Sequence, residues 1–347
     1  MFAVFAQGIV ETVGTLPATR TAAESRERGG GRRLEVGLSS PTDSLWTQPE
    51  WLAEATAWIR ERVAVTGEIE QFHVRWWSTV LRVPTAAGDL FFKAVAPAHL
   101  FEVGLTARLD ELQPGRVTEV VAVDAERGWF LMRDAGTRLR ELVETAADLD
   151  HWERLLPEYA RLQIEVAPHA QELLDLGTPD HRLAVLPQQL RDLAETDYGR
   201  FALEALPRFE ELCSTLAAAG IPETIQHDDL HDGQVFWRDG RYLFFDWGDS
   251  CVSHPFHSLT VTLRAIAWKL DLPPGGRELE RLRDAYLEPF GAGPELAELG
   301  YRTGTVARAI AWHRMQVPEH IEDPSAPEYG LKLFLEGGPI GSWREPD

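Results

Sequence analysis

Two short stretches of the sequence carry side chains that could perform group-transfer chemistry. The first, residues 226–234, contains Asp229 and Gln234, and the second, residues 244–248, contains Asp246. Between them lie two apolar, β-prone runs separated by an Asp-Gly dipeptide, a pattern that predicts a β-hairpin. Folding this hairpin brings Gln234 beside Asp246. Two carboxylates and an amide oxygen placed in this way suit a hydroxyl nucleophile and a hard cation such as magnesium.

A lysine in the first third of the chain is the next candidate for chemistry. Lys93 ends an apolar, β-prone run, and it is one of only three lysines, the other 31 of the 34 basic residues being arginines. Phosphoryl transfer needs a compact cation beside the phosphates. The alternative is a strand-end lysine whose stem covers apolar surface. Because the aspartate motif follows at the expected distance, we favour the role in phosphate binding.

The bulk composition limits the classes of partner and location. A length of 347 residues leaves room for about two domains. The net charge of −21 argues against a nucleic-acid or anionic-membrane partner, and it permits a cationic substrate. Two cysteines, Cys213 and Cys251, make no disulfide framework, and no apolar run approaches the ~18 residues needed to cross a bilayer. We therefore expect a cytoplasmic protein.

The N-terminal part of the sequence divides into a polar leader and a β-rich segment. Residues 15–42 are rich in Arg, Gly, Ser and Thr, so we expect residues 1–44 to be a disordered leader or the result of a translation start placed too far upstream. After residue 45 the patterns predict two helices and a small antiparallel sheet. The predicted helices are 48–64 and 99–112, and the β-rich segments are 69–84, 90–95, 117–123 and 129–132.

A break at Ala135-Gly136 separates this segment from a helical one. Apart from the hairpin, the remaining sequence shows mainly helical periodicity. The predicted helices are 138–144, 147–166, 187–197, 201–219, 256–270, 277–289, 295–313 and 328–335.

The aspartate motif as a whole resembles the catalytic and metal-binding loops of the aminoglycoside phosphotransferase family, whose members are relatives of the protein kinases. His227 and Asp229 match the start of the family pattern, and Asp246 matches the aspartate that stands before an aromatic residue. Position 234 is Gln where the pattern has Asn, which keeps the carbonyl oxygen on a longer arm. The resemblance extends over roughly residues 45–335.

The resemblance implies an α+β fold of the two-lobed, protein-kinase-like type. The N-terminal nucleotide-binding lobe, residues 45–134, would hold a small antiparallel β-sheet and one main helix. The C-terminal catalytic and substrate-binding lobe, residues 135–347, would be larger and mostly helical. The implied reaction is ATP- and magnesium-dependent transfer of the γ-phosphoryl group to a hydroxyl of a small molecule.

The resemblance also implies a role for each matching side chain. Asp229 would orient the acceptor hydroxyl, while Gln234 and Asp246 would hold Mg²⁺ against the phosphates. Lys93 would bind the phosphates with Glu102 as its acidic partner. For Glu102 the alternative is a carboxylate placed favourably in the first turn of a helix.

Four further positions are candidates for nucleotide contacts. Ser78 or Thr79 would supply a hydroxyl to the loop that covers the phosphates, or they are ordinary strand residues. The carbonyl of Arg133 and the amide of Ala135 would recognise the adenine, since they lie where the family has its hinge. His227 is expected to support the loop backbone.

The acceptor is defined less closely than the nucleotide site. Asp228 and His231 lie beside the catalytic aspartate in sequence, where they could contact the acceptor or support the loop. Glu319, Glu322 and Asp323 form an acidic segment that could face a cationic acceptor, or they are solvated surface. The family phosphorylates aminoglycosides and other antibiotics, sugars and amino alcohols, and the fold does not choose among them.

Two other functions compete with the kinase interpretation. His227 and Asp229 also form two thirds of a non-haem iron site, which would require a double-stranded β-helix around them. A catalytically silent, kinase-like binding protein is the other alternative, favoured only by Gln234. Measurement of iron content and of ATP consumption separates these possibilities.

Overall fold

A computed structural model describes residues 45–315 and 325–342, all of which belong to one unit, Ser39–Asp347. Because this one unit holds both predicted lobes, the boundary between them stays a prediction. The predicted leader and the three acidic residues suggested for the acceptor site lie outside the described residues: 1–44, Glu319, Glu322 and Asp323.

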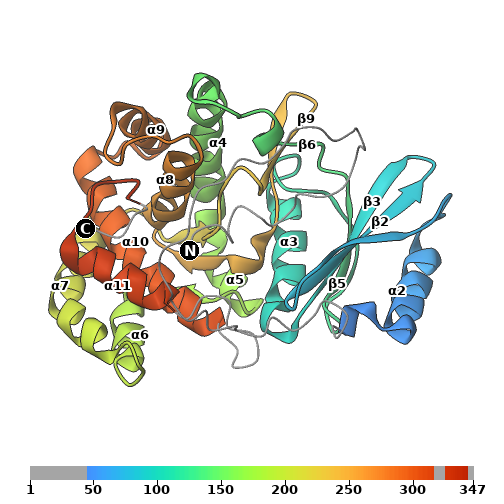
Figure 1. Ribbon diagram of the computed structural model, residues 1–347, viewed down its shortest axis with the longest axis horizontal. Coiled ribbons are helices and arrows are strands. Elements are labelled where there is room, and N and C mark those ends of the chain that lie inside the picture. Colours follow the sequence, from blue (N-terminus) through green and yellow to red (C-terminus); the bar gives the residue numbers. More distant parts are fainter. Residues whose placement is uncertain (1–44, 316–324, 343–347) are drawn as a thin grey trace, which may run out of the picture. The chain divides into compact units, whose positions relative to one another are not determined.

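A five-stranded antiparallel sheet forms the first part of the described chain (Figure 1). Its strands follow the order β1-β2-β3-β5-β4, and two helices accompany them. The elements are α2 (Pro49–Arg62), β1 (Glu70–Val74), β2 (Ser78–Thr85), β3 (Gly88–Val95), α3 (Phe101–Leu112), β4 (Val120–Asp124) and β5 (Trp129–Arg133). The predicted small antiparallel sheet is therefore present.

The alternation of side chains along β3 decides which way its lysine points. Phe92 is fully buried and packs its ring 5.6 Å from that of Trp58 on α2, a burial that contributes about 1.5–3 kcal/mol. Lys93 and Val95 face the other way, because successive strand residues point to opposite faces. On that face Val95 packs with Val103 of α3. Lys93 is thus directed away from α2 and toward α3.

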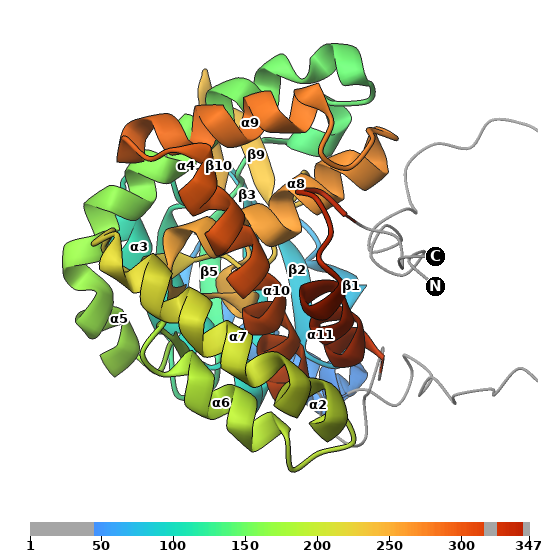
Figure 2. The same ribbon diagram turned by 90° about the vertical axis from the view of Figure 1, so that its left-hand side faces the viewer.

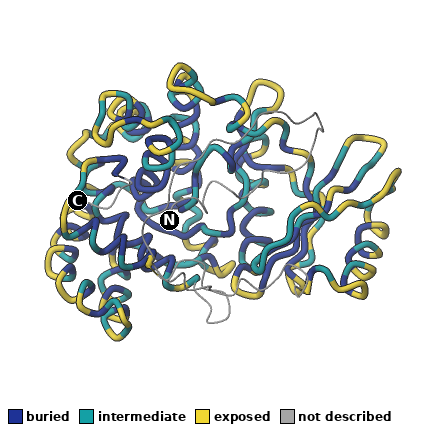
Figure 3. The backbone as a smooth tube through the Cα atoms, in the orientation of Figure 1, coloured by how far each residue is buried: buried dark blue, intermediate teal, exposed yellow. Residues whose placement is uncertain are grey.

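The rest of the described chain is mostly helical. Its helices are α4 (Asp150–Val166), α5 (Ala170–Asp175), α6 (Leu186–Leu193), α7 (Gly199–Ala218), α8 (Ser258–Lys269), α9 (Arg277–Leu287), α10 (Pro294–Met315) and α11 (Ala326–Glu336). Helix α10 lies against α7, α8 and α11 (Figure 2). Every residue from 303 to 312 is buried, so α10 is a central helix without a solvent-facing side over this stretch. The buried segments gather in the middle of the helical part (Figure 3).

Two small sheets are inserted among these helices. One joins β6 (Thr137–Arg138), β9 (Val235–Arg238) and β10 (Arg241–Phe244), and the other joins β7 (Asp180–His181), β8 (Thr224–Gln226) and β11 (Cys251–Ser253). Strands β9 and β10 form the predicted hairpin. Its turn residues Asp239 and Gly240 have φ values of 51° and 81°, as a two-residue turn with positive φ at both positions requires.

Some local predictions were wrong. The segment 138–144 was expected to be a helix, yet it contains β6 and a single 3₁₀ turn, Leu139–Glu141. Pairing of Thr137 with Trp237 of the hairpin overrides the helical pattern there. Strands β7, β8 and β11 were not predicted, because two or three residues carry no readable periodicity. Among the described residues, no helix combines the length and the apolar character needed to span a membrane.

Candidate active site

Two predicted residues, Glu102 and Asp246, meet at Lys93. Its Nζ atom donates to Glu102 Oε1 at 2.5 Å and to Asp246 Oδ1 at 2.6 Å. The Lys93 and Glu102 side chains are 5% and 2% exposed, whereas that of Asp246 is 36% exposed. The pair with Glu102 is therefore closed, and the carboxylate of Asp246 is open to a ligand.

The charges of this cluster shift one another's titration. Burial disfavours the Lys93 ammonium, yet Asp246 and Glu102 raise its pKa above the ordinary value. Burial alone would raise the pKa of Asp246, but the ammonium lowers it below its usual range. Burial raises the pKa of the enclosed Glu102 carboxyl to about 7, in spite of the attraction of Lys93. The ammonium is thus a permanent cation at neutral pH.

Backbone geometry after the hairpin brings Asp246 into this position. Asp246 has φ 64° and ψ 70°, a left-handed conformation that aspartate tolerates better than most residues. The 3₁₀ turn Trp247–Asp249 follows directly. A side chain at Gly248 would place its first carbon 3.0 Å from Glu102 Oε2, so glycine permits the close approach of this turn to α3.

The predicted catalytic loop, residues 227–234, lies between β8 and β9. His227 is buried; its Nε2 donates to the Phe245 carbonyl at 2.8 Å and its backbone amide donates to the Tyr159 hydroxyl at 3.0 Å. Its ring also lies 4.8 Å from that of Trp247. His227 thus ties the catalytic loop to the segment that carries Asp246, as expected for a supporting residue.

This arrangement contradicts the iron-oxygenase alternative. That alternative required a double-stranded β-helix around His227 and Asp229, but the loop is flanked by the three-residue strand β8 and by a hairpin. The segment after β11 is helix α8. The oxygenase hypothesis was therefore wrong at the level of the fold.

Asp229 is held as a carboxylate by neighbours from its own loop. Its Oδ2 atom accepts from Gln234 Nε2 at 3.2 Å and lies 3.4 Å from His231 Nε2. Burial would raise the pKa of Asp229, but the cations of His231 and Arg308 hold it below its ordinary value. At neutral pH Asp229 is available to accept a hydrogen bond from a hydroxyl group.

The donor atoms near Asp246 suit magnesium. Gln234 gives its amide hydrogens to Asp229, which leaves its Oε1 atom without a hydrogen-bond donor among the described residues. Asp246 likewise engages only Oδ1, through Lys93, within residues 45–315 and 325–342. Over the same residues no group of three or more His, Cys, Asp or Glu side chains is arranged to hold a metal. Two oxygen ligands completed by phosphate and water are what Mg²⁺ usually takes.

The remaining nucleotide candidates are placed but not brought together with Asp229. Ser78 and Thr79 open strand β2, and both are buried. The Thr79 hydroxyl donates to the His73 carbonyl at 2.7 Å and accepts from Gln71 at 2.8 Å, so it serves the β1–β2 pair. The role of either residue in covering phosphates stays a prediction.

The hinge candidates lie at the end of β5. The carbonyl of Arg133 accepts from the Thr118 hydroxyl at 3.2 Å and keeps a second lone pair. Ala135 is buried at 5% exposure. A side chain at Gly136, whose φ is 98°, would collide with the Trp237 carbonyl, so glycine lets the hinge approach the hairpin. Recognition of adenine by Arg133 and Ala135 stays a prediction.

Asp228 and His231 have structural partners. Asp228, with φ 60°, accepts from Gln226 Nε2 at 2.9 Å and from Arg308 Nη1 at 2.9 Å. Burial opposes the charge of His231, yet Asp229 and Asp232 raise its pKa to about 9. His231 is therefore a cation beside the carboxylate of Asp229. Contact of either residue with an acceptor stays a prediction.

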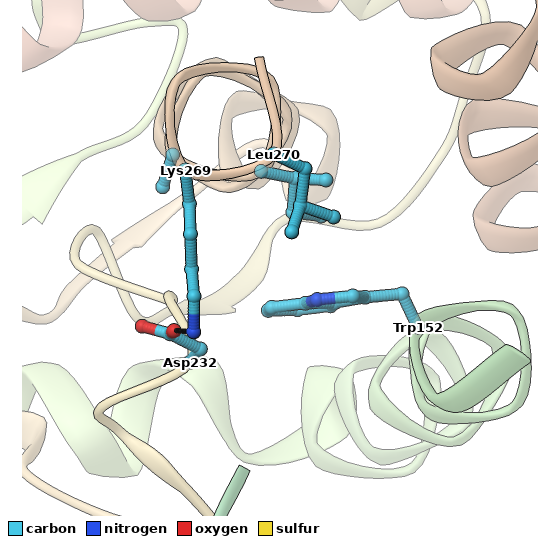
Figure 4. Close-up of a pocket in the computed structure, with 6 residues that line it drawn as sticks. Trp152, Asp232, Lys269 and Leu270 are labelled. Atoms are coloured by element: carbon cyan, nitrogen blue, oxygen red, sulfur yellow. Dashed lines mark hydrogen bonds and ion pairs between the residues drawn. The ribbon is translucent and has the colours of Figure 1, made fainter. Parts of the chain in front are cut away.

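A small cavity borders the far flank of the catalytic loop (Figure 4). It is lined by Trp152, Asp232, Ala265, Ile266, Lys269 and Leu270. Lys269, from the end of α8, donates to Asp232 Oδ2 and points toward it across the cavity wall. Arg140 Nη2 lies 3.5 Å from Asp232 Oδ1. The loop is thus anchored on this side by two cations that the sequence did not single out.

The other residue that sequence reasoning missed is Arg308 on α10. It contacts the loop at Asp228 and Asp229 and the 3₁₀ turn at Asp249. Only the arginine content of the chain was visible in the sequence, and nothing near residue 308 marked it. A basic residue in the middle of an otherwise apolar and small-residue helix was the one available signal.

Comparison with known proteins gave a family match and several structural matches. The model of the "Phosphotransferase enzyme family" matches residues 62–299, which is more than half of the chain. No curated protein sequence matched.

Among solved structures, the chain is similar to choline kinase LicA from Streptococcus pneumoniae, with a TM-score of 0.59, 12% identity, and 82% of this chain and 98% of that chain covered. It is similar to macrolide 2′-phosphotransferase MphH from Brachybacterium faecium, with a TM-score of 0.53, 15% identity, and coverage of 85% and 99%. It is also similar to amicoumacin kinase hAmiN in complex with AMP-PNP, Ca²⁺ and Ami, with a TM-score of 0.53, 12% identity, and coverage of 84% and 96%. The predicted α+β, protein-kinase-like fold is confirmed.

Proposed function

The chain belongs to the phosphotransferase enzyme family, whose model matches residues 62–299, and from this premise we propose that it is an ATP- and magnesium-dependent kinase of small hydroxylated molecules. The family membership confirms the resemblance drawn from the aspartate motif. As a member, the chain is a small-molecule phosphotransferase, so the catalytically silent alternative is not favoured.

The observation that carries the proposal is the contact of Lys93 with Asp246 at the end of the hairpin that follows Asp229. Lys93 Nζ donates to Asp246 Oδ1 at 2.6 Å, and Gln234, whose side chain donates to Asp229, accepts at its backbone carbonyl from Phe245, the residue before Asp246. A cation, two free oxygen ligands and a carboxylate are the groups that phosphoryl transfer uses. The ATP analogue named in the amicoumacin kinase structure supports ATP as the donor.

The proposed reaction divides the roles as follows. Lys93 binds the α- and β-phosphate oxygens. Gln234 and Asp246 would hold Mg²⁺, and the bound ion would supply neutralisation of the charge on the phosphates. The acceptor hydroxyl lies against Asp229, which orients it and takes its proton. A bond forms between the acceptor oxygen and the γ-phosphorus as the bond from that phosphorus to the β–γ bridging oxygen breaks, and ADP leaves.

The acceptor is a hydroxyl of an aminoglycoside-like antibiotic, an amino sugar, a sugar or an amino alcohol. The names of the similar structures, a choline kinase, a macrolide phosphotransferase and an amicoumacin kinase, support this range without choosing within it. We propose that the reaction takes place in the cytoplasm, where ATP is supplied. Two buried free cysteines, Cys213 and Cys251, agree with a reducing compartment.

A screen of acceptors tests the proposal. The protein is incubated with MgATP and a panel of aminoglycosides, macrolides, amino sugars, sugars and choline, and both ADP and phosphorylated product are measured. We expect one ADP for each phosphate ester and loss of both in Asp229→Asn. Omission of Mg²⁺ with chelator present should stop turnover. The proposal would be contradicted if no acceptor in the panel were phosphorylated, no ADP were formed and no nucleotide were bound.

A further inference from the structure

We propose that Arg308 is a positioning residue, which fixes the catalytic carboxylate by tying two loops of the active site to helix α10. The inference rests on the proposed function, since it takes Asp229 as the group that orients the acceptor. It concerns a residue about 80 positions downstream of that carboxylate, outside every motif of the sequence.

The guanidinium group serves three carboxylates at once. Its Nη1 atom lies 2.9 Å from Asp228 Oδ2, while its Nη2 atom lies 3.2 Å from Asp249 Oδ2 and 3.9 Å from Asp229 Oδ1. The Arg308 side chain is 3% exposed. Lysine could not reproduce these contacts, because a point charge lacks the planar fork of donors.

The carboxylates belong to the two loops that carry the chemistry. Asp228 immediately precedes Asp229 in the catalytic loop, and Asp249 ends the 3₁₀ turn that follows Asp246. Arg308 thus joins the loop that orients the acceptor to the loop that holds Mg²⁺. Since α10 is buried on all sides around this residue, it provides a rigid base for both loops.

A gain in folding stability does not by itself explain why Arg308 forms these buried ion pairs. A buried ion pair is often no more stabilising than apolar side chains of the same volume. Here the Arg308 guanidinium contacts three carboxylates, of which Asp229 also lies 3.4 Å from the cationic His231. Its placement next to Asp229, on a buried helix, points to a role in the geometry of the reacting group.

A neighbouring arginine provides a matched control. The guanidinium carbons of Arg264 and Arg308 lie 5.6 Å and 5.1 Å from the centre of the same ring, that of Trp312. Arg264 differs in one respect, because within residues 45–315 and 325–342 no carboxylate lies within ion-pairing distance of it. Its replacement removes a nearby cation and the same ring contact, but no hydrogen bond or ion pair to either loop within the described residues.

The experiment compares steady-state kinetics of five forms: wild type, Asp228→Asn, Asp228→Asn/Arg308→Met, Arg308→Lys and Arg264→Met. Asp228→Asn serves as the background because it removes the buried charge that Arg308→Met alone would leave unpaired. Turnover of MgATP is followed with the acceptor found in the screen, or with water as acceptor. Circular dichroism and thermal unfolding confirm that each variant is folded.

We expect kcat of Asp228→Asn/Arg308→Met to fall about 100-fold below that of Asp228→Asn, because a small displacement of Asp229 is enough for such a loss. The KM for MgATP should stay unchanged, since Arg308 contacts none of the residues proposed to bind the nucleotide. Arg308→Lys should recover part of the loss, and Arg264→Met should keep the wild-type kcat. The proposal is overturned if the double variant keeps the kcat of Asp228→Asn. It is also overturned if the KM for MgATP rises by the same factor as kcat falls, or if Arg264→Met loses as much kcat as the double variant does.

A second measurement does not depend on turnover. In a crystal structure of Asp228→Asn/Arg308→Met, Asp229 should have left its contact with Gln234 Nε2, which is 3.2 Å in the wild type. Retention of that contact overturns the positioning role even if the variant is inactive. If the wild type itself neither phosphorylates an acceptor nor hydrolyses ATP, the proposed function fails, and the crystal structure still decides the role of Arg308.

Discussion

Two buried cations, Lys93 and Arg308, lie at the candidate active site, and their surroundings differ. Lys93 binds two carboxylates, of which Asp246 has a side chain that is 36% exposed. Arg308 binds three, whose side chains are 5%, 18% and 28% exposed at Asp228, Asp229 and Asp249. The partners of Arg308 are therefore more enclosed than Asp246.

The difference in the exposure of their partners indicates different roles for the two cations. A cation whose partner is open to a ligand can exchange that partner for a phosphate, as a nucleotide-binding lysine must. An enclosed cation cannot, so its effect passes through the residues that it holds. Substitution of Lys93 should accordingly change nucleotide binding, whereas substitution of Arg308 should change only the chemical step.

The largest effect is expected at the Asp229 carboxylate, whose Oδ1 atom lies 3.9 Å from Arg308 Nη2. Asp229→Asn should lower kcat by about 1,000-fold, because the acceptor hydroxyl loses the group that orients it and takes its proton. Nucleotide affinity should remain close to that of the wild type, as measured by titration with Mg-AMP-PNP. Near-normal turnover in this variant would remove Asp229 from the catalytic role.

The second largest effect on activity is expected for Lys93→Met, and this effect should differ in kind from that of replacing Arg308. We expect kcat/KM for MgATP to fall about 100-fold, with KM carrying a substantial part of the loss, because the phosphates lose their charge partner. Steady-state kinetics over a wide range of MgATP checks this. Lys332→Met is a suitable control, since Lys332 pairs with Glu328 at the surface of α11. An effect on kcat alone would contradict the division of roles.

A smaller effect is expected from the pH dependence of Lys93's enclosed partner. The pKa of Glu102 is raised by burial to about 7, so one pH unit below that value only about a tenth of it is ionised. Lys93 then loses a charged anchor, and the KM for MgATP should rise as the pH falls from about 8 to about 6. Glu102→Gln should show no such rise. If the KM for MgATP of Glu102→Gln rose by the same factor on acidification, a group other than Glu102 would be responsible.

The same titration predicts the sign of a stability change. The Glu102 carboxyl titrates near 4.5 when unfolded and at about 7 when folded, so between these values only the folded protein holds the proton. This group's contribution to stability is therefore complete at low pH and is lost as the pH rises through about 7. Relative to Glu102→Gln, the wild type should gain stability on acidification, as measured by chemical denaturation at several pH values.

The smallest effect is expected at the far flank of the catalytic loop. Lys269→Met removes a cation that is 27% exposed and binds Asp232, while Arg140 remains within reach. We expect a loss of about 1 kcal/mol in the free energy of unfolding and a fall in Tm of about 2 °C. Turnover should change little. If Lys269→Met lost as much activity as removal of the Arg308 side chain does, the catalytic loop would depend equally on its contacts with Lys269 and with Arg308.

The contrast between Lys93 and Arg308 also marks the limit of sequence reasoning. Lys93 was found because lysine is rare in this chain, and Asp229, Gln234 and Asp246 because they lie on one hairpin with an Asp-Gly turn. These signals are local, and they also led to the correct fold class.

Arg308 carried no such signal. It is one of 31 arginines, and its partners lie 80 and 59 residues away in sequence. Its role depends on how a fully buried helix packs against two loops, which no periodicity encodes. The short strands β8 and β11, of which β8 leads directly into the catalytic loop, were missed for the same reason, since tertiary pairing alone creates them.

A crystal structure with Mg²⁺ and a non-hydrolysable ATP analogue tests the central claim most directly. We predict that Lys93 Nζ lies within hydrogen-bond distance of an α- or β-phosphate oxygen, that Gln234 and Asp246 bind the metal, and that the γ-phosphate faces Asp229. A nucleotide bound elsewhere, or phosphates out of reach of Lys93, would contradict the account.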